Sequence, residues 1–487
     1  MYKDLRSVIF IVGVFSLIFS LLMLIPVTLN YYTGCRWQNL LYSCFCTLFF
    51  SLTCILCGKL SRLKRTEVFI VTSSVWIVLS IMSAIPFIFE LKISFTDAFF
   101  EAVSGLTTTG ATVLTNLQDK TPGILIWRSL LNAIGGLGII VTGIFLLPCL
   151  KVISLHELYC SESSETSRKF KHGIVKSSMY IFIIYCALIT LCSILYRITG
   201  MSGFDAICHA MSTVSTGGFS NYDDSLQHFS SIYIEVIAIV FMLLSSCPFI
   251  VYLKIITKQS YYNEQVISFF IIVCFSSVIS VISCYFDGIM SSLSLFDMLR
   301  YSIFSVVTLS TSTGFVSYNY DSWHFFSVFG IFIMLIGGCS GSTNSGIKVY
   351  RIVLLTKALI AYISNFVQPS KVITIRYNKR EVDNNSICNV GVFFFLYIFI
   401  LFVGCIVVAI IGEVDFFTAF SAVSATLSNT GPGMGNIVGP SANYDSLLPA
   451  VKLFLSFLML MGRLEIIPFF ASICLITHSL FKRHKLN

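Results

Sequence analysis

The sequence predicts an all-α polytopic membrane protein, and three observations lead to this fold class. The 487-residue chain is 56% hydrophobic and only 11% charged, so as a soluble protein it would expose large apolar patches. Ten apolar stretches are long enough to cross a bilayer, which takes about 20 residues of helix. A short segment with a polar end recurs four times between these stretches, and internal repeats of this kind define an architecture.

The ten predicted spans form one leading hairpin and four pairs. They are expected at residues 8–30, 40–58, 68–90, 124–150, 174–198, 230–256, 266–286, 324–356, 390–412 and 449–480. Each of the last four pairs encloses one copy of the short segment. The chain therefore divides into an N-terminal two-helix hairpin and four repeats, with the second helix of the third repeat broken: 1–66, 67–172, 173–262, 263–388 and 389–487.

The basic residues concentrate in alternate connections, which sets the orientation. Most of the 31 Lys and Arg side chains lie in residues 1–7, 59–67, 151–176, 254–265, 348–389 and 482–487. Because basic loops stay in the cytoplasm, both termini are expected there, and the four short segments enter from the outside. The net charge of +8 thus reflects membrane topology and predicts contact with lipid, not binding of nucleic acid.

Cysteine and histidine usage predicts no catalytic or cofactor site. The 17 cysteines are scattered singly, many within apolar runs, and are interpreted as reduced packing residues. His209 and Ser212 share one short helix, but no carboxylate completes a triad with them, so no enzyme is predicted. Glu101 and His209 occupy nearly equivalent places in the first two copies and are interpreted as supports for the short helices.

The four copies begin with helix-start signals. Ser-x-x-Asp, which caps a helix N-terminus, occurs at Ser94/Asp97, Ser202/Asp205 and Ser294/Asp297. The fourth copy starts Glu413-Val-Asp415 and lacks the serine. Each short helix should begin near the outer surface and point inwards, so that its C-terminal partial negative charge favours a cation. The helices of the third and fourth copies are expected to be about one turn longer.

Each copy ends in two residues with hydroxyl or amide side chains, followed by glycine. The residues are Thr108, Thr109, Gly110, Ser215, Thr216, Gly217, Ser312, Thr313, Gly314, Asn429, Thr430 and Gly431. Glycine permits the angles that turn carbonyls towards an axis, and rings of carbonyls replace the hydration shell of an ion. Backbone at membrane depth must be buried or line a watery path. The copies are therefore predicted to be pore loops, four pseudo-symmetric helix–pore loop–helix repeats around one central pore.

The eighth span contains a run of small polar residues: Gly337, Gly338, Ser340, Gly341, Ser342, Thr343, Asn344, Ser345 and Gly346. Gly337 and Gly341 could form a GxxxG packing face. A packing face needs small residues on one side only, whereas here they occupy every side. Each glycine within a helix lowers the stability of that helix by about 1 kcal/mol. The span is therefore predicted to break into a loop beneath the ion filter that the four pore loops would form.

Arg463 lies inside the last predicted span, where a charge is expensive and faces a cavity or a partner. Glu465 is two residues away on a different helix face, and is a poor partner. Two interpretations remain open: an ion pair with another span, or a fixed positive charge beside the cation path that helps to gate it. Lys348 and Arg351 are expected near the cytoplasmic mouth.

Six motifs of the sequence resemble those of a known protein family: VSGLTTTGAT, STVSTGGFSNYD, LSTSTGF, SATLSNTGPGMG, GGCSGSTNSGIK and MGRLEIIPFF. Through them the whole chain resembles the membrane subunit of the Trk-type potassium uptake system, within the Trk/Ktr/HKT superfamily. The resemblance implies a potassium pathway in the cell inner membrane, since glycine stands in every loop. It also implies homodimers, a cytoplasmic nucleotide-binding regulatory subunit, and a gate formed by residues 337–346 with Arg463.

A potassium symporter coupled to protons or sodium is the alternative function. Coupling to protons would need a titratable relay within the membrane. The carboxylates on the spans, Glu90, Glu235 and Glu465, are few and form no evident relay. No cofactor is expected on this chain, and the potassium ion at the loop residues is its substrate.

Overall fold

The computed structural model describes residues 2–59, 65–150, 174–258, 262–287, 294–321, 323–370 and 373–484. Within these ranges the chain is helical apart from loops and one two-stranded antiparallel hairpin, β1 (Arg376–Tyr377) and β2 (Arg380–Glu381). The all-α class is confirmed. The predicted cytoplasmic loop at 151–176 lies almost wholly outside the described residues, as does much of the loop at 59–67.

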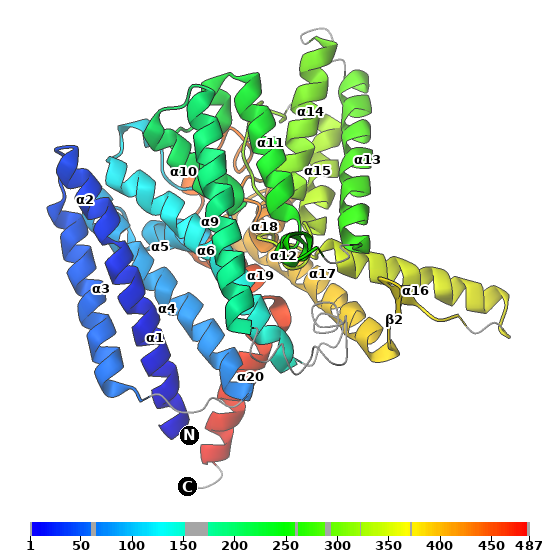
Figure 1. The fold of residues 1–487 in the computed structure, drawn as a ribbon, viewed down its shortest axis with the longest axis horizontal. Helices are drawn as coiled ribbons and strands as arrows, with labels where there is room; N and C mark the ends of the chain where they lie inside the picture. Colours follow the sequence, from blue (N-terminus) through cyan, green and yellow to red (C-terminus); the bar gives the residue numbers. More distant parts are fainter. Residues whose placement is uncertain are drawn as a thin grey trace.

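The N-terminal hairpin lies at one edge of the bundle (Figure 1). It consists of α1 (Tyr2–Leu22), α2 (Leu24–Tyr32) and α3 (Gln38–Cys57). The Ser51 hydroxyl donates to the Gly13 carbonyl, which ties α3 to α1. Asn30 accepts from the Gly123 backbone N–H and so ties α2 to the first repeat. The hairpin buttresses that repeat and carries no copy of the short segment.

The first two repeats have the predicted helix–short helix–helix order. Repeat one is α4 (Arg65–Leu91), α5 (Phe95–Leu106), η1 (Leu117–Asp119) and α6 (Pro122–Leu150). Repeat two is α9 (Ile174–Ile198), α10 (Gly203–Val214), η2 (Ser225–Phe229), α11 (Ile232–Ser246) and α12 (Phe249–Ile256). Helices α11 and α12 meet at 86°, because Pro248 ends the helical hydrogen bonding between them.

Repeats three and four each contain a second helix that is interrupted. Repeat three is α13 (Glu264–Phe286), α14 (Leu295–Ser310), α15 (His324–Ile336) and α16 (Val349–Val367). Repeat four is α17 (Asn384–Gly412), α18 (Phe416–Leu427), η4 (Tyr444–Ser446), α19 (Pro449–Arg463) and α20 (Ile466–His484).

Two of the predicted spans are interrupted: the break within 324–356 was predicted, whereas 449–480 is wrong as one continuous helix. The span expected at 324–356 ends at Ile336, and α16 then runs across the direction of α13 and α15 (Figure 1). The span expected at 449–480 is split into α19 and α20, which meet at 105°. The described residues contain eight helices of spanning length and composition, or up to ten if each bent pair counts as one span.

The short helices α5, α10, α14 and α18 lie inside the bundle, each packed against the two flanking helices of its own repeat. The last two turns of α5 are fully buried, and the same is true of α18. α5 also packs against α19, so the last repeat contacts the first. The pairing of spans around each short segment is therefore as predicted, and it brings the ends of all four segments together.

Candidate cation pathway

The short helices are capped at their outer ends by the predicted side chains. Ser94, Ser202 and Ser294 each accept a hydrogen bond from the backbone N–H of the aspartate three residues later. In the fourth copy Asp415 itself is the cap. It accepts from the Thr418 hydroxyl and from the Thr418 N–H, and these two hydrogen bonds lower the pKa of its carboxyl group. Because Asp415 precedes the helix, α18 has 12 residues, like α5 and α10. The extra turn occurs only in α14, with 16 residues.

The four loops that follow share one backbone turn. Their first residues have left-handed φ angles of 52° to 54°: Thr108, Thr216, Ser312 and Asn429. Two residues further on stands a glycine with positive φ: Gly110, Gly218, Gly314 and Gly431. The residue between them donates its N–H to a carbonyl five positions back in the helix, as Thr109 does to Ser104. The four segments are thus structurally equivalent, residue by residue.

This equivalence corrects the second loop by one residue. Gly217 was predicted as its anchor, but Gly218 has the positive φ and matches Gly110. Gly217 instead matches Thr109, and its N–H donates to Ser212 in the corresponding bond. The predicted Ser215 therefore corresponds to Thr107, one position before the turn. Two adjacent glycines in the sequence left this register ambiguous.

The four loops close a ring. A Cβ atom added at Gly110 would lie 2.5 Å from the carbonyl oxygen of Gly217 in the second loop. A Cβ atom added at each of the other three glycines would lie within 2.5 Å of the equivalent carbonyl oxygen of the next loop, namely Gly218 with Thr313, Gly314 with Thr430 and Gly431 with Thr109. The contacts therefore run from loop one to two, three, four and back to one. No hydrogen bond in the described part of the chain ends on these four carbonyl oxygens.

Side-chain hydroxyls support the loops. Thr107 and Thr109 share a hydrogen bond of 2.7 Å, Thr311 and Thr313 one of 2.7 Å, and Ser428 and Thr430 one of 2.8 Å. The second loop has no such pair, because Gly217 replaces the hydroxyl residue. Asn429 donates to Thr109 in the first loop and to the Met459 carbonyl on α19. These hydroxyl pairs and the Asn429 amide nitrogen thus hold the loop backbone.

A cavity of about 350 Å³ adjoins the ring. It is lined by residues that follow the loop glycines in the chain, so it lies on that side of the ring. All four positive-φ glycines line it, together with Asp223 and Tyr444. The Asp223 carboxylate accepts the backbone N–H groups of Asn116 and Leu117, joining the second loop region to the first. Tyr444 donates its N–H to the Thr112 carbonyl, joining the fourth to the first. The cavity is a vestibule to the ring.

The break in the third repeat is a loop, as predicted. Residues 337–348 contain no helix, and Gly337, Gly341 and Gly346 have positive φ. The Thr343 hydroxyl accepts from Thr216 in the second loop at 3.1 Å and faces the Ser245 carbonyl at 3.3 Å. The loop is therefore packed directly against the ring on the side away from the vestibule.

Arg463 joins this loop to two other repeats. Its guanidinium donates to the Thr343 carbonyl at 2.8 Å, the Ser345 hydroxyl at 2.9 Å and the Gly135 carbonyl on α6 at 3.0 Å. Arg463 is 1% exposed, and it forms no ion pair with any described residue. Glu465 turns away from it and pairs with Lys348 and Arg351 at 2.9 and 2.7 Å. The structure thus brings the two predicted gate elements into contact.

Comparisons with known proteins agree with this architecture. A family model described as "TrkH: Cation transport protein" matches residues 38–479. The chain belongs to the TrkH family. It is 34% identical over 484 residues to the Trk system potassium uptake protein TrkH of Vibrio parahaemolyticus, covering 95% of this chain and 96% of that protein. It is also 34% identical over 481 residues to the Trk system potassium uptake protein TrkH of Escherichia coli, with the same coverage.

The fold agrees with a solved TrkH structure. The crystal structure of the potassium transporter TrkH from Vibrio parahaemolyticus matches with a TM-score of 0.86 and 31% identity, over 97% of this chain and 98% of that one. TrkH proteins are membrane transporters, and this member is a multi-pass membrane protein and not an enzyme. The described residues contain no group of three or more His, Cys, Asp or Glu side chains placed to hold a metal ion.

Two buried basic residues of this TrkH family member were missed in the sequence. Lys452 on α19 is 4% exposed and pairs with Asp97, at the start of α5, at 2.7 Å. Arg128 on α6 is 1% exposed and pairs with Glu101 at 2.8 Å. Both lie in apolar stretches predicted to span the membrane. The signal that identified Arg463, a lone charge in an apolar span, would have found them too.

Proposed function

We propose that this chain carries potassium into the cell across the inner membrane, through a selective pore with a gate, under the control of a cytoplasmic regulatory subunit. The closed ring of four glycine loops, with carbonyls that accept no hydrogen bond from described residues, is the observation that carries the proposal. The relatives support the choice of ion, because two of them are named as Trk system potassium uptake proteins.

The filter consists of the four loop segments. Backbone carbonyls replace the hydration shell of a cation, and the helix C-termini of α5, α10, α14 and α18 add partial negative charge beside them. With no carboxylate in the loop segments themselves, the field suits a monovalent ion better than a divalent one. The residues that hold potassium are Thr108, Thr109, Gly110, Thr216, Gly217, Gly218, Ser312, Thr313, Gly314, Asn429, Thr430 and Gly431.

The gate consists of residues 337–346 and Arg463. A fixed positive charge beneath the ring raises the electrostatic barrier to a cation, the more so because it is buried where the dielectric constant is low. The hydrogen bonds from Arg463 to Thr343 and Ser345 hold the loop under the filter. Opening therefore requires that these bonds break or that α19 and the loop move together.

The assembly proposed for the chain follows its family resemblance and its charge pattern. Both termini lie in the cytoplasm, where a nucleotide-binding subunit of the Trk type controls the gate, and two copies of the chain associate.

Coupled symport is the weaker proposal. Glu235 pairs with Arg300, and Glu465 pairs with Lys348 and Arg351. Glu90 accepts a hydrogen bond from Thr121, so the three carboxylates have separate partners.

Ion uptake in potassium-transport-deficient cells tests the function. Cells carrying the chain together with its regulatory subunit are expected to take up potassium and its analogue rubidium in preference to sodium. Potassium flux into proteoliposomes at fixed voltage, with and without a proton gradient, tests coupling and should not change with the gradient. Equal uptake of sodium and potassium would refute the filter, and flux that follows the proton gradient would establish symport.

A further inference from the structure

We infer that Arg128 is a positioning residue for ion selectivity, because it braces the first two filter loops from behind at their outer ends. The inference rests on the proposed filter and assigns a role to a residue outside the loop segments. Arg128 lies on α6, the second helix of repeat one, and it is 1% exposed. Arg128 is also one of the residues that line the vestibule beside the ring.

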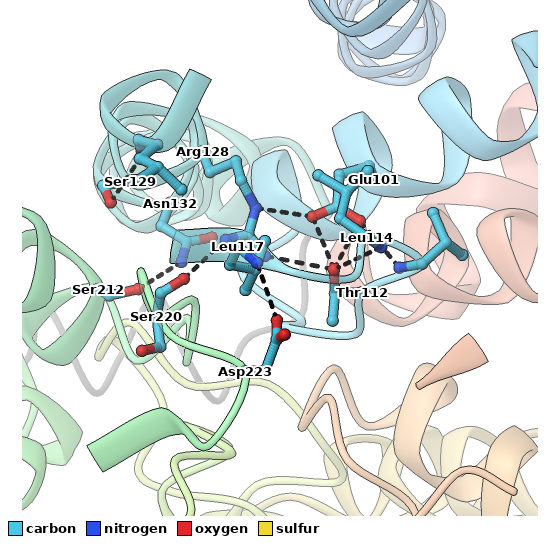
Figure 2. A network of polar contacts seen from close by, with 12 residues as sticks. Glu101, Thr112, Leu114, Leu117, Arg128, Ser129, Asn132, Ser212, Ser220 and Asp223 are labelled. Carbon is cyan, nitrogen blue, oxygen red and sulfur yellow. Dashed lines mark hydrogen bonds and ion pairs between the residues drawn. The ribbon is translucent and has the colours of Figure 1, made fainter. Parts of the chain in front are cut away.

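One guanidinium makes four different contacts, and Figure 2 shows the polar ones. Its Nε donates to Glu101 at 2.8 Å, one terminal nitrogen donates to the Ser220 carbonyl at 2.7 Å, and the other lies 3.3 Å from the Thr112 hydroxyl. Its face lies 4.1 Å from the centre of the Phe219 ring. Hydrogen bonds from three different nitrogen atoms of one side chain require the planar guanidinium group of arginine, which lysine does not have.

The two loop residues that Arg128 contacts are equivalent by symmetry. Thr112 is two residues after Gly110, and Ser220 is two residues after Gly218. Arg128 therefore joins the same position of two adjacent loops, directly beyond the ring. A shift of the guanidinium would move both loops relative to each other, and with them the carbonyls of Thr109 and Gly217.

Glu101 and His209 complete the brace. Glu101 is fully buried on α5, and its carboxylate accepts from the Val113 N–H at 3.1 Å and from the Thr112 hydroxyl at 3.0 Å. His209 is at the matching position on α10, and its Nε2 lies 3.0 Å from the Ser220 hydroxyl. These residues were predicted to support their helices. The contacts show that each holds the exit of its own loop.

The other two loops are held without buried charge at this position. The equivalent of Thr112 in the third loop is Val316, whose backbone bonds the Ser225 hydroxyl and the Gln227 N–H. In the fourth loop it is Gly433, whose N–H donates to the Val438 carbonyl. The charged brace is thus confined to loops one and two, where Gly217 also removes the supporting hydroxyl pair. The loop that lacks the hydroxyl pair is thus held from outside by the hydrogen bond from Arg128 to Ser220.

Arg128→Lys tests the inference, with Arg300→Lys as the matched control. Arg300 on α14 pairs with Glu235 at 3.1 Å, with side chains 15% and 5% exposed. Among the described residues its other polar contacts are with Asp297 and Tyr301, neither of them in a filter loop. After a check of assembly by size-exclusion chromatography, potassium and sodium permeability are measured in proteoliposomes. Arg128→Lys should lower the potassium/sodium ratio about tenfold, because it removes hydrogen bonds from a charged group. The control should retain the ratio of the wild type.

An unchanged ratio in assembled Arg128→Lys would overturn the inference. Should that variant fail to assemble, Thr112→Val removes one loop contact at nearly constant volume and must lower the ratio in the same direction. An equal fall in the Arg300→Lys control would show a general effect of weakening buried pairs and would also overturn it. A wild-type protein without preference for potassium would refute the proposed filter itself, which is a distinct result.

Discussion

The register of the second filter loop gives a sharp prediction, because two adjacent glycines should respond differently to the same substitution. Gly218 has φ +71°, a conformation that disfavours any residue with a Cβ atom. Gly217 has an ordinary negative φ. A Cβ atom added there would lie 2.5 Å from the amide group of the Asn132 side chain. We therefore expect Gly218→Ala to lower selective uptake more than Gly217→Ala does.

The magnitude follows from the backbone. Forcing alanine into the left-handed region costs about 1 to 2 kcal/mol, which alone is roughly a 5- to 30-fold change in an equilibrium between native and distorted loops. At Gly218 the added Cβ also meets the Thr313 carbonyl, a backbone atom that cannot rotate away. At Gly217 the obstacle is a side-chain amide, which can turn at the expense of its 2.7 Å hydrogen bond to Ser212.

Potassium-dependent growth and rubidium uptake measure the effect, with membrane expression of each variant as the control. Gly218→Ala should lose at least about tenfold in uptake at equal expression, following from the strain above. The double variant Gly217→Ala/Asn132→Ala removes the obstacle to the new methyl group and should take up more rubidium than Gly217→Ala alone. If Gly217→Ala is the more damaging single change, the structural register is incorrect and the predicted anchor at Gly217 stands.

Three further predictions concern the filter and the gate. Gly110→Ser should lower the potassium/sodium ratio in the same uptake assay, since its added Cβ meets the Gly217 carbonyl; an unchanged ratio would count against the ring. Arg463→Ala should raise flux in proteoliposomes while the protein still assembles, because it removes both the positive charge and the bonds to Thr343. Deleting residues within 337–346 should also raise permeation, and wild-type flux for both of these variants would refute the gate.

The repeats were predictable because their signals are local. Ser-x-x-Asp caps act within a single turn, and long apolar stretches define spans without knowledge of their neighbours. The small residues at 337–346 likewise disfavour a helix by themselves. For these reasons the short helices, their pairing with spans and the interrupted helix of repeat three all agree with the structure.

The features that were wrong or missed depend largely on contacts between distant residues. The bend of 105° has a local signal that was missed, because Pro468 cannot donate an N–H to the Leu464 carbonyl, but its angle does not follow from the sequence. Glu465 adopts φ +59° there while it pairs with Lys348 and Arg351, on a different repeat. The pairing of Lys452 with Asp97 joins residues at opposite ends of the chain, and only the assembled bundle shows it.

The closure of the ring between the fourth loop and the first has a consequence for biosynthesis. Gly431 packs on Thr109, Tyr444 bonds Thr112, and Lys452 pairs with Asp97, so the last repeat to leave the ribosome supplies one wall for the first. Until α17 to α19 are inserted, the first loop has a neighbour on one side only. Polar backbone at membrane depth needs a protein or aqueous environment. A chain that terminates after the third repeat should therefore present an open polar seam to lipid.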